Sequence, residues 1–584
     1  MFSTLRTQLS RMRTLLREAY DSFSWQGRTA ITAGTILGAC ALFALLGIVN
    51  SKFLVSVPAD GGTLREGVIG TPRFVNPLLA VTETDRDLST LLYAGLMRVG
   101  ADGTLVPDLA ESYTVSPDGL VYDFTLRANL TFHDKKPLTA KDVVFTVARA
   151  QDQDVKSPKR PNWEGVKAEA VDDTHVRFTL SKPYAPFLEN TTLGIIPAHI
   201  WEGAPSSEWV ASAFNLRPVG SGPFMLGDTT QDSSGIPTSY NLDAWDKFTR
   251  GRPHLDMIHI AFFPNETSLI TALESGTIEA LHGVSGDTAK ELTGKGYTVT
   301  ESPLPRVFGI FLNQAQAPVL ADSAVRSALS LTANRALIVD QVLHGYGTAI
   351  TGPIPPGSLG YEETQIPAQD FDSARALLEK AGWKRGDDGI YAKGAKPASK
   401  NKKTPAVAAS RLAFTLTVPD VSELKSASDI LVRDWKTLGA DVTVSLLAMN
   451  DVNQNILRPR KYDALFFGEI VGRESDLFAF WHSSQRGDPG LNIALYTNRK
   501  ADTLLEQARK TSNREDAANA YHAFSTLVTA DTPAIFLYAP KFIYLLPKDL
   551  IGVSLPPPNV SADRFAESSS WYREVDRVWK VFAK

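Results

Sequence analysis

Cysteine is almost absent from this sequence, because its 584 residues contain one, Cys40. A single thiol excludes an internal disulfide framework and any cysteine-rich metal site. The nine histidines form no His-Glu-x-x-His segment that would hold zinc, and we interpret His254 and His259 as structural. We therefore expect no bound metal and no cofactor.

Recognisable catalytic motifs are also missing. The segment Gly-Val-Ser-Gly-Asp at 283–287 lacks the Gly-x-Ser-x-Gly spacing that exposes a nucleophilic serine on a sharp turn. The sequence contains neither a P-loop nor a Gly-x-Gly-x-x-Gly segment. An enzyme needs a nucleophile or an acid–base set, and none is recognisable here. We expect a protein that is not an enzyme and has no catalytic residues.

Neither sign of charge is in marked excess. Lysine and arginine number 60 and aspartate and glutamate 64, which gives a net charge of -4. A nucleic-acid-binding domain usually carries a strong basic excess, so nucleic acid is not an expected partner. The chain is 43% hydrophobic and 21% charged, which is an ordinary globular composition. Its length predicts several domains or subdomains.

One long hydrophobic run stands near the N-terminus. Ala30–Val49 contains no charged residue and is about long enough to cross a bilayer as a helix. Arginines precede it: Arg6, Arg11, Arg13, Arg17 and Arg28. By the positive-inside rule, we expect a cytoplasmic segment at 1–29 and a single-pass transmembrane anchor at 30–50. A linker at 51–61 then leads to a main body outside the cytoplasm.

Cys40 gives this run a second interpretation. Leu37-Gly38-Ala39 before it fits the pattern at which a bacterial lipoprotein signal is cut, but apolar residues continue as far as Val49. A cleaved signal peptide is a third interpretation, although its apolar core typically has about 7–15 residues. We favour an intact span, because it uses every apolar residue and needs no processing. Whether Cys40 carries a lipid stays open.

Strand-like and helix-like segments alternate through the main body. Strands are predicted for eight alternating or β-branched runs: 120–127, 174–180, 257–263, 307–313, 412–418, 441–447, 462–470 and 534–540. A helix is predicted from Thr139, with Asp142 in the position of a capping box, and another over 422–439, ended by Gly439. Lys384–Ser410 is predicted to be an exposed hairpin followed by a loop. The class is α/β.

Several segments in order resemble one family. They are FVNPLL (74–79), the stretch 91–149 with its PDLAES and SPDG segments, GSGPFML (220–226), FLNQAQAPVLADSAVRSALSLTANRALIVDQVLHG (311–345), FDSARALLEKAGW (371–383), YDALFFGEI (462–470), NIALYTNRKADTLLEQAR (492–509) and ADTPAIFLYAP (530–540). Over roughly 62–545, the sequence is similar to the extracytoplasmic solute-binding proteins of ABC importers. Within these, it resembles the oligopeptide, dipeptide and nickel class, solute-binding family 5.

This resemblance implies a two-lobed periplasmic-binding-protein-like fold, of type II and of the large class with an extra subdomain. Lobe one would comprise 62–310, with 88–212 as the extra subdomain. The chain would return to lobe one at 535–584, which includes the C-terminal segment. Lobe two would comprise 311–534. A ligand would close the cleft by hinge bending. The implied partners are a peptide or other small solute and the permease subunits of an ABC transporter, and we expect a monomer.

The resemblance also implies a ligand site. Peptide-binding members capture the ligand's ammonium with an aspartate ahead of an Asp-Pro pair, and the equivalent stretch here is 468–484. If Asp476 replaces the Asp of that pair, the ammonium position falls on Arg473, a cation that would repel an amine. Glu469 or Glu474 could substitute only if the loop is shifted. Further tentative ligand residues are Trp481, Asn492, Tyr496 and Arg306.

Three functions stay open at this point. The first is delivery of a peptide or peptide-like solute to an ABC permease. The second is binding of a non-peptide solute, with an anionic group held by Arg473. The third is a membrane-tethered sensor or scaffold that uses the same fold. The identity of the ligand does not follow from the sequence.

Overall fold

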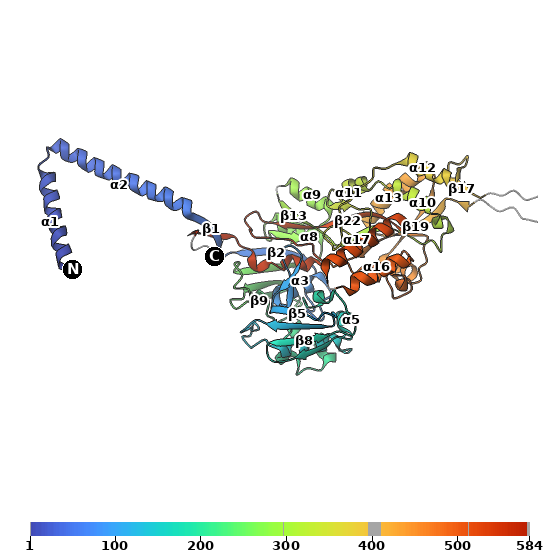
Figure 1. Cartoon of the computed structure of the whole chain (residues 1–584), viewed down its shortest axis with the longest axis horizontal. Coiled ribbons are helices and arrows are strands. Elements are labelled where there is room, and N and C mark those ends of the chain that lie inside the picture. Colours follow the sequence, from blue (N-terminus) through green and yellow to red (C-terminus); the bar gives the residue numbers. More distant parts are fainter. Residues whose placement is uncertain (1, 296, 395–409, 473, 512, 581–584) are drawn as a thin grey trace, which may run out of the picture. The chain divides into compact units, whose positions relative to one another are not determined.

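The computed structural model describes residues 2–295, 297–394, 410–472, 474–511 and 513–580. The chain divides into two compact units (Figure 1). One contains the chain up to Ala59 together with the chain from Arg573 onward, and the other is Asp60–Tyr572. Each unit is described separately.

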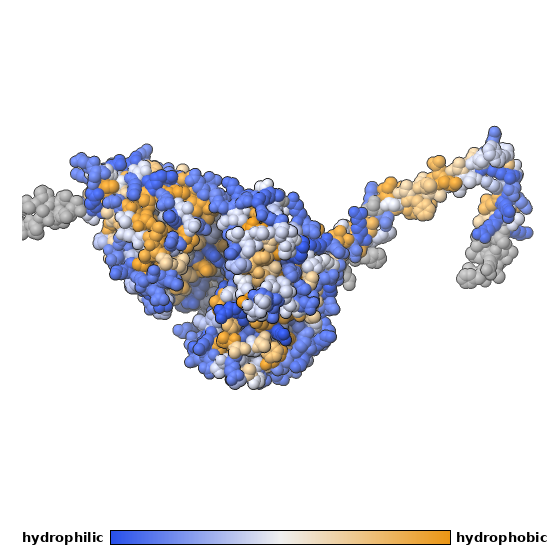
Figure 2. All heavy atoms as spheres, turned by 180° about the vertical axis from the view of Figure 1, so that it is seen from behind, coloured by the Kyte–Doolittle hydropathy of each residue, from blue (hydrophilic) through white to orange (hydrophobic). Residues whose placement is uncertain are grey.

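The first unit contains a long apolar helix. α1 (Phe2–Asp21) precedes α2 (Trp25–Phe53), and the Ser24 side chain caps α2 by accepting the Gly27 N–H. Trp25–Ile48 has a mean hydropathy of 2.1 and is long and apolar enough to cross a membrane. Figure 2 shows this helix largely in orange. α2 contains the whole run predicted at 30–50.

A strand follows α2 directly and pairs with the end of the chain. β1 (Leu54–Ala59) runs antiparallel to β23 (Glu574–Trp579). The Phe53 and Trp579 rings stack at 6.2 Å where the helix ends. The sequence resemblance indicated no such pairing, because the two strands are separated by almost the whole chain.

A large mixed sheet forms the framework of the second unit. Its strand order is β20-β19-β21-β14-β22-β12-β2-β11-β10-β9. The strands are β20 (Asp441–Leu447), β19 (Ala413–Pro419), β21 (Ala464–Ile470), β14 (Arg306–Leu312), β22 (Ala534–Leu546), β12 (Ala280–His282), β2 (Thr63–Ile69), β11 (Met257–Phe263), β10 (Pro237–Ala244) and β9 (Phe224–Gln231). β13 (Thr298–Pro303) and β15 (Gly347–Ala349) also pair with β22.

β22 joins the two halves of this sheet. Its first part pairs with β14 from Ala534 to Tyr538, and its last part pairs with β13 from Lys541 to Leu546. We call the half with β2 and β9–β12 the first lobe and the half with β14 and β19–β21 the second lobe. The chain therefore passes between the lobes at two places, between β13 and β14 and within β22, so these two crossings are the expected hinge.

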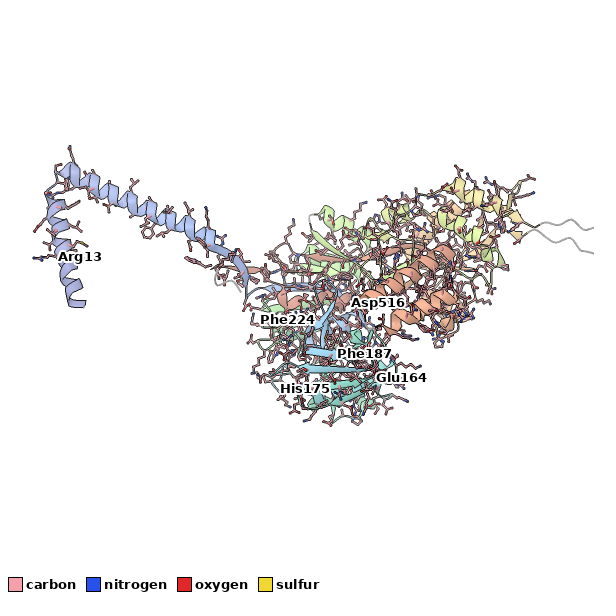
Figure 3. All side chains as sticks on the ribbon, viewed as in Figure 1. Arg13, Glu164, His175, Phe187, Phe224 and Asp516 are labelled. Atoms are coloured by element: carbon pink, nitrogen blue, oxygen red, sulfur yellow. The ribbon has the colours of Figure 1, made fainter. Side chains whose placement is uncertain are left out.

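A smaller sheet belongs to the first lobe. Its order is β5 (Ala110–Val115), β6 (Val121–Leu126), β8 (His175–Thr179) and β7 (Lys167–Ala170), and β3 (Met97–Val99) pairs with β4 (Leu105–Pro107). Phe187 packs against this sheet, 4.8 Å from the Tyr122 ring and 5.6 Å from the Phe178 ring (Figure 3). These strands lie inside the range predicted for the extra subdomain. The limits of that subdomain and of both lobes stay predictions.

The remaining elements cover the sheets. The helices are α3 (Glu83–Leu92), α4 (Ala140–Gln151), α5 (Arg160–Trp163), α6 (Phe187–Asn190), α7 (Ala198–Trp201), α8 (Glu266–Glu274), α9 (Gly286–Gly294), α10 (Ser323–Leu331), α11 (Arg335–Gln341), α12 (Phe371–Lys380), α13 (Ser422–Leu438), α14 (Met449–Asp451), α15 (Phe478–Trp481), α16 (Arg499–Lys510) and α17 (Arg514–Asp531). Short 3₁₀ turns include η5 (Ser483–Gln485) and η6 (Ser561–Phe565). The strands β16 (Lys384–Arg385), β17 (Tyr391–Lys393) and β18 (Ser410–Arg411) form a small sheet.

Most local predictions are confirmed. All eight predicted runs contain strands, and α4 begins after Thr139, whose backbone N–H donates to Asp142 Oδ2 at 2.9 Å. Gly439 ends α13 with a φ of 115°. One boundary was wrong, because β22 continues to Leu546 rather than ending at Pro540. Pro540 lies between the residues of β22 that pair with β14 and those that pair with β13, and it stands opposite Gly347 of β15. Part of the predicted loop, 395–409, lies outside the described residues.

A fully buried arginine ties the first lobe together. Arg564 donates to Glu66 Oε1 at 2.6 Å and to both oxygens of Asp87 at 2.8 Å. The Tyr544 hydroxyl donates to Glu66 Oε2 at 2.6 Å, and His282 Nε2 lies 3.3 Å from Asp87. β2, α3, β12, β22 and η6 therefore meet at one guanidinium. Burial alone would raise the pKa of Asp87. The charges and hydrogen bonds of Arg564 and His282 together lower it by more, so the net shift of the pKa is downward.

Replacing Arg564 should destabilise the fold strongly. Arg564→Met would leave two buried carboxylates without their cation, which typically costs about 3–5 kcal/mol of unfolding free energy. Urea unfolding of the purified full chain in detergent, followed by tryptophan fluorescence, measures this cost. Arg411→Met is the matched control, since Arg411 pairs with Asp388 at the surface and should contribute at most about 1 kcal/mol. Equal losses for the two variants would contradict this account of the Arg564 network.

Candidate functional site

Segments of both lobes border a cavity of about 460 Å³. The first-lobe wall comes from α3, from the chain between Tyr184 and Gly194, and from the chain between Asn559 and Ala566. The second-lobe wall comes from 471–472 and 474–476, directly after β21. The volume falls in the range of small-molecule sites, about 300–1,000 Å³. The cavity is the candidate binding site.

α3 is held firmly at both ends. At its start, the Thr82 side chain accepts the Asp85 N–H at 3.1 Å, and Asp85 Oδ1 accepts the N–H groups of Arg73 and Phe74. At its end, the Leu92 carbonyl accepts the Gly222 N–H at 2.9 Å. A Cβ at Gly220 would overlap the Leu92 carbonyl oxygen, so only glycine allows this approach. The helix therefore presents a fixed face to the cavity.

An ionic cluster closes one end of the first-lobe wall. Arg250 Nη1 donates to Glu567 Oε2 at 3.0 Å, and Arg250 Nε lies 3.4 Å from Asp108 Oδ1. Arg98 donates to the other oxygen of Glu567. Burial raises the pKa of Asp108 despite the opposing charges of Arg250, Arg98 and Arg127. These cations and anions neutralise one another.

A three-residue contact joins the lobes beside the cavity. Tyr184, from the first lobe, donates its hydroxyl to Asp476 Oδ2 at 3.3 Å, and Arg509 of α16 lies 3.3 Å from the same oxygen. The Arg509 guanidinium also stacks 5.1 Å from the Tyr184 ring centre. Burial raises the pKa of Asp476, while Arg509 and Tyr184 act in the opposite direction. We call Tyr184, Asp476 and Arg509 the interlobe bridge.

Glu474 also lies at the cavity but has a partner of its own. Arg514 Nη1 approaches its two carboxylate oxygens at 2.6 and 2.7 Å. Arg473, the predicted ligand-binding cation, lies outside the described residues. A ligand role for Glu474 or Asp476 therefore stays a prediction. Each carboxylate would have to bind the ligand while it is also paired with an arginine, Arg514 or Arg509.

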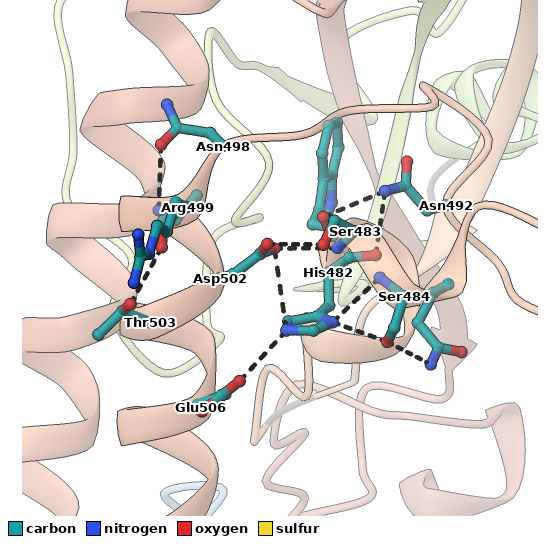
Figure 4. A network of polar contacts seen from close by, with 12 residues as sticks. His482, Ser483, Ser484, Asn492, Asn498, Arg499, Asp502, Thr503 and Glu506 are labelled. Atoms are coloured by element: carbon teal, nitrogen blue, oxygen red, sulfur yellow. Dashed lines mark hydrogen bonds and ion pairs between the residues drawn. The ribbon is translucent and has the colours of Figure 1, made fainter.

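A polar network in the second lobe connects the segment around His482 with α16 (Figure 4). Asn492 donates to the carbonyls of Trp481 and His482, both at 3.2 Å. Asp502 of α16 accepts the Ser483 N–H at 2.9 Å, and His482 Nε2 lies 3.5 Å from Glu506. The contacts of Ser483 and His482 with Asp502 and Glu506 attach the segment that follows α15 to α16. Arg509, the arginine of the interlobe bridge, lies on the same helix after Glu506.

Four predicted ligand residues contact protein instead of bordering the cavity. Trp481 is fully buried in the core, and Asn492 is fully buried against backbone carbonyls. The Tyr496 hydroxyl donates to Asp531 at 2.6 Å. Arg306 is half-buried, and burial lowers its pKa although Glu83 acts in the opposite direction. Contact of any of these four with a ligand stays a prediction.

The sequence analysis missed the first-lobe residues of the site. Tyr184, Arg86 and Lys159 all border the cavity. Arg86 belongs to a helix whose polar and apolar residues look like any surface helix, and Lys159 lies in an irregular segment. In the sequence, Arg86 and Lys159 could be recognised only as residues of segments assigned to the first lobe. A motif match does not show which face of such a segment lines the cleft.

Glu469 is a buried acid just before the second-lobe wall. It is 4% exposed on β21, and neither carboxylate oxygen has a hydrogen-bond partner among the described residues. Burial raises its pKa well above the ordinary value, while the Trp481 indole acts in the opposite direction. Its register partner on β14 is Val307, in the same core. The uncharged acid is therefore the form that this core accommodates.

A two-lobed α/β body with a cavity between its lobes defines a class of protein that traps small molecules by hinge closure. A model of the bacterial extracellular solute-binding proteins, family 5 (middle region), matches residues 104–490. The chain belongs to this family. The family match confirms the resemblance stated from the motifs, and with it the two-lobed fold.

Individual relatives extend the match to most of the chain. The oligopeptide-binding protein AppA of Bacillus subtilis is 28% identical over 520 residues, covering 87% of this chain and 92% of that protein. The structure of Bacillus subtilis AppA in complex with a nonapeptide has a TM-score of 0.64 at 26% identity, covering 89% of this chain and 100% of that one. The structure of NikZ from Campylobacter jejuni in complex with Ni(L-His) has a TM-score of 0.66 at 25% identity, covering 88% and 100%.

The buried Glu469 should make stability depend on pH. Because its folded pKa is raised, the favourable neutral form is fully populated below about pH 4.5, and its contribution is lost as pH rises through the folded pKa. Glu469→Gln removes this loss, so the variant should gain in melting temperature over the wild type at pH 8 but not at pH 4.5. Glu363→Gln, at an exposed glutamate, is the control. A gain for Glu469→Gln of the same size at both pH values would contradict the assignment.

Proposed function

We propose that this chain is a membrane-tethered extracytoplasmic binding protein that captures a peptide or peptide-like solute and delivers it to the permease of an ABC transporter. The observation that carries the proposal is the cavity, which both lobes border and whose lining includes Tyr184 and Asp476 of the interlobe bridge. A solute between the lobes would add contacts that only the closed form makes. Such differential binding shifts the open–closed equilibrium toward closure.

The relatives support a peptide or a peptide-like ligand. AppA carries the name of an oligopeptide-binding protein and was seen with a nonapeptide, whereas NikZ was seen with a nickel–histidine complex. The family therefore contains binders of both peptides and small amino-acid complexes. A cavity of about 460 Å³ suits a short peptide or a single conjugated amino acid better than a long peptide.

The first unit supports the tether. α2 contains a stretch that is long enough to cross a bilayer, Arg28 lies near its start, and aromatic rings lie near both ends, at Trp25 and at the Phe53–Trp579 stack. Aromatic side chains favour the two interfaces of a membrane, and basic residues favour its cytoplasmic side. With this orientation the body that follows β1 lies outside the cytoplasm.

The interlobe bridge should control how long a solute is retained. Tyr184→Phe removes a hydrogen bond to a carboxylate, which is worth roughly 1.5–3 kcal/mol, so the closed form should release solute about tenfold faster or more. The full chain, purified from cells in detergent, is denatured, and the released small molecules are quantified by mass spectrometry. Tyr113→Phe is the control, because Tyr113 lies on β5 away from the cavity.

The wild type and the Tyr113→Phe variant should yield peptides or amino-acid conjugates, and Tyr184→Phe should yield far less of the same species. If the wild type yields no such solute, the proposed function is wrong. Equal yields from all three chains would show that the bridge does not close the binding site.

An intact α2 should be visible in the mass of the mature protein. The tether proposed here needs every residue of Trp25–Ile48, so the protein isolated from membranes should retain the sequence on both sides of Cys40. Intact-mass spectrometry of the membrane fraction measures this. A mature chain that begins at Cys40 with added lipid would instead identify a lipoprotein.

A further inference from the structure

Two cations on the first-lobe wall of the cavity form no ion pair with any residue that the structure describes. Arg86 projects from α3, and Lys159 directly precedes α5; both border the cavity. Among the described residues, neither side chain has a hydrogen-bond or ion-pair partner within contact distance, and Arg86 Nε is buried without one. An arginine normally satisfies several of its five donors when it is partly buried. The two side chains therefore hold donors that the folded chain does not use.

The other charged residues on the cavity wall are already engaged. Their pairings are Arg98 and Arg250 with Glu567, Arg250 with Asp108, Glu474 with Arg514, and Asp476 with Arg509. Asp563 accepts the N–H groups of Asn559 and Val560, and Glu189 accepts from Asn559 at 3.5 Å. Both of these acids have further partners as well. Among the described residues, Arg86 and Lys159 are thus the cations of the wall that form no ion pair.

The surroundings of Lys159 disfavour its charged form. Burial lowers the pKa of its ammonium, and the nearby charge of Arg86 lowers it further, whereas Asp563 acts in the opposite direction. Asp563 already accepts the backbone N–H groups of Asn559 and Val560. An anion between Arg86 and Lys159 would relieve both the desolvation and the repulsion.

The fold keeps this arrangement in place. Asp87, next to Arg86, is held by both terminal nitrogens of Arg564, so α3 cannot turn its cationic face away from the cavity without breaking the buried network. On the other side, the Ser157 hydroxyl donates to the Leu78 carbonyl at 2.6 Å and accepts the Lys159 N–H at 3.2 Å. Both backbones are therefore anchored before any ligand arrives.

We propose that Arg86 and Lys159 form an anion subsite, and that the solute of this protein presents a carboxylate to it. The proposal rests on the proposed function and narrows it to short peptides or peptide-like solutes with an acidic group. A guanidinium can bind a carboxylate through two parallel hydrogen bonds, and a lysine adds a point charge. The carboxylate could be the C-terminus of the solute or an acidic side chain, since both offer the same chemistry.

The test separates these two sources. A mixed-sequence tripeptide library is prepared as free acids and as C-terminal amides, and the purified full chain in detergent is incubated with each. Species that remain bound after gel filtration are identified by mass spectrometry. The chains compared are the wild type, Arg86→Gln, Lys159→Gln, the double variant and Lys182→Gln, a control at an exposed lysine that does not border the cavity.

The wild type and Lys182→Gln should retain free-acid peptides, and each cavity variant should retain about tenfold less. Retention of amides only when they contain Asp or Glu would assign the subsite to an acidic side chain, and loss of all amides would assign it to the C-terminus. The cavity variants should melt no lower than the wild type, because each removes a repulsive charge. This result would not be expected if Arg86 or Lys159 only supported the fold.

Two results would overturn the inference in different ways. If the wild type binds tripeptides, and the cavity variants bind the same peptides equally well, the subsite is wrong and the proposed function stands. If the wild type binds neither form of the library, both the subsite and peptide capture are wrong. Binding of inorganic phosphate in place of either library would likewise overturn the assignment to a carboxylate.

Discussion

One buried guanidinium, that of Arg564, fixes the geometry on which the site depends. It lies between Glu66 and Asp87, and all three side chains are almost completely excluded from solvent. Charges can be buried in this way only if each is paired at short range and its remaining donors and acceptors are satisfied. The Tyr544 hydroxyl and the Ser561 carbonyl complete that requirement. Because the partners are separated by up to 498 positions, this cluster forms only when the first lobe is fully assembled.

The consequence for the cavity is direct. α3 and η6 meet at Arg564, and both also border the cavity through Arg86 on one side and Asp563 on the other. The first-lobe wall is thus preorganised. The second-lobe wall, by contrast, reaches the first lobe through the hydrogen bond from Tyr184 to Asp476, the packing of the Arg509 guanidinium over the Tyr184 ring, and the Ala185 N–H donated to the Arg509 carbonyl at 3.2 Å. A rigid wall facing a wall held by few contacts suits a protein that closes over its ligand, since opening then breaks little besides the contacts to the ligand.

The sequence was sufficient for the class of fold and for many local elements. Alternating runs located the strands, Gly439 marked the end of α13, and Asp142 marked the start of α4, because these features depend on neighbouring residues. The continuation of β22 past Pro540 was missed, because the sequence does not show that the strand changes partners there. Trp481 and Asn492 belong to family motifs, yet they pack into the second lobe and its supporting network.

The candidate site was harder to predict for a physical reason. Its side chains come from Arg86, Lys159, Tyr184 and Asp476, which no short motif unites, and their roles follow from which charges are paired. Pairing is a tertiary property: Arg98 and Arg250 look like Arg86 in the sequence, but Glu567, more than three hundred positions further on, neutralises them. Among the described residues, only the assembled structure separates the neutralised cations from Arg86 and Lys159, which form no ion pair.

The most direct test of this account is the distance between the lobes with and without solute. Spin labels at Val171→Cys in the first lobe and Lys425→Cys in the second, in a Cys40→Ala chain, report that distance by double electron–electron resonance; both positions are exposed. The solute that co-purifies with the chain should shift the distribution toward the shorter distance, and its removal should restore the longer one. A distribution that is the same in both states would contradict capture by closure of the two lobes.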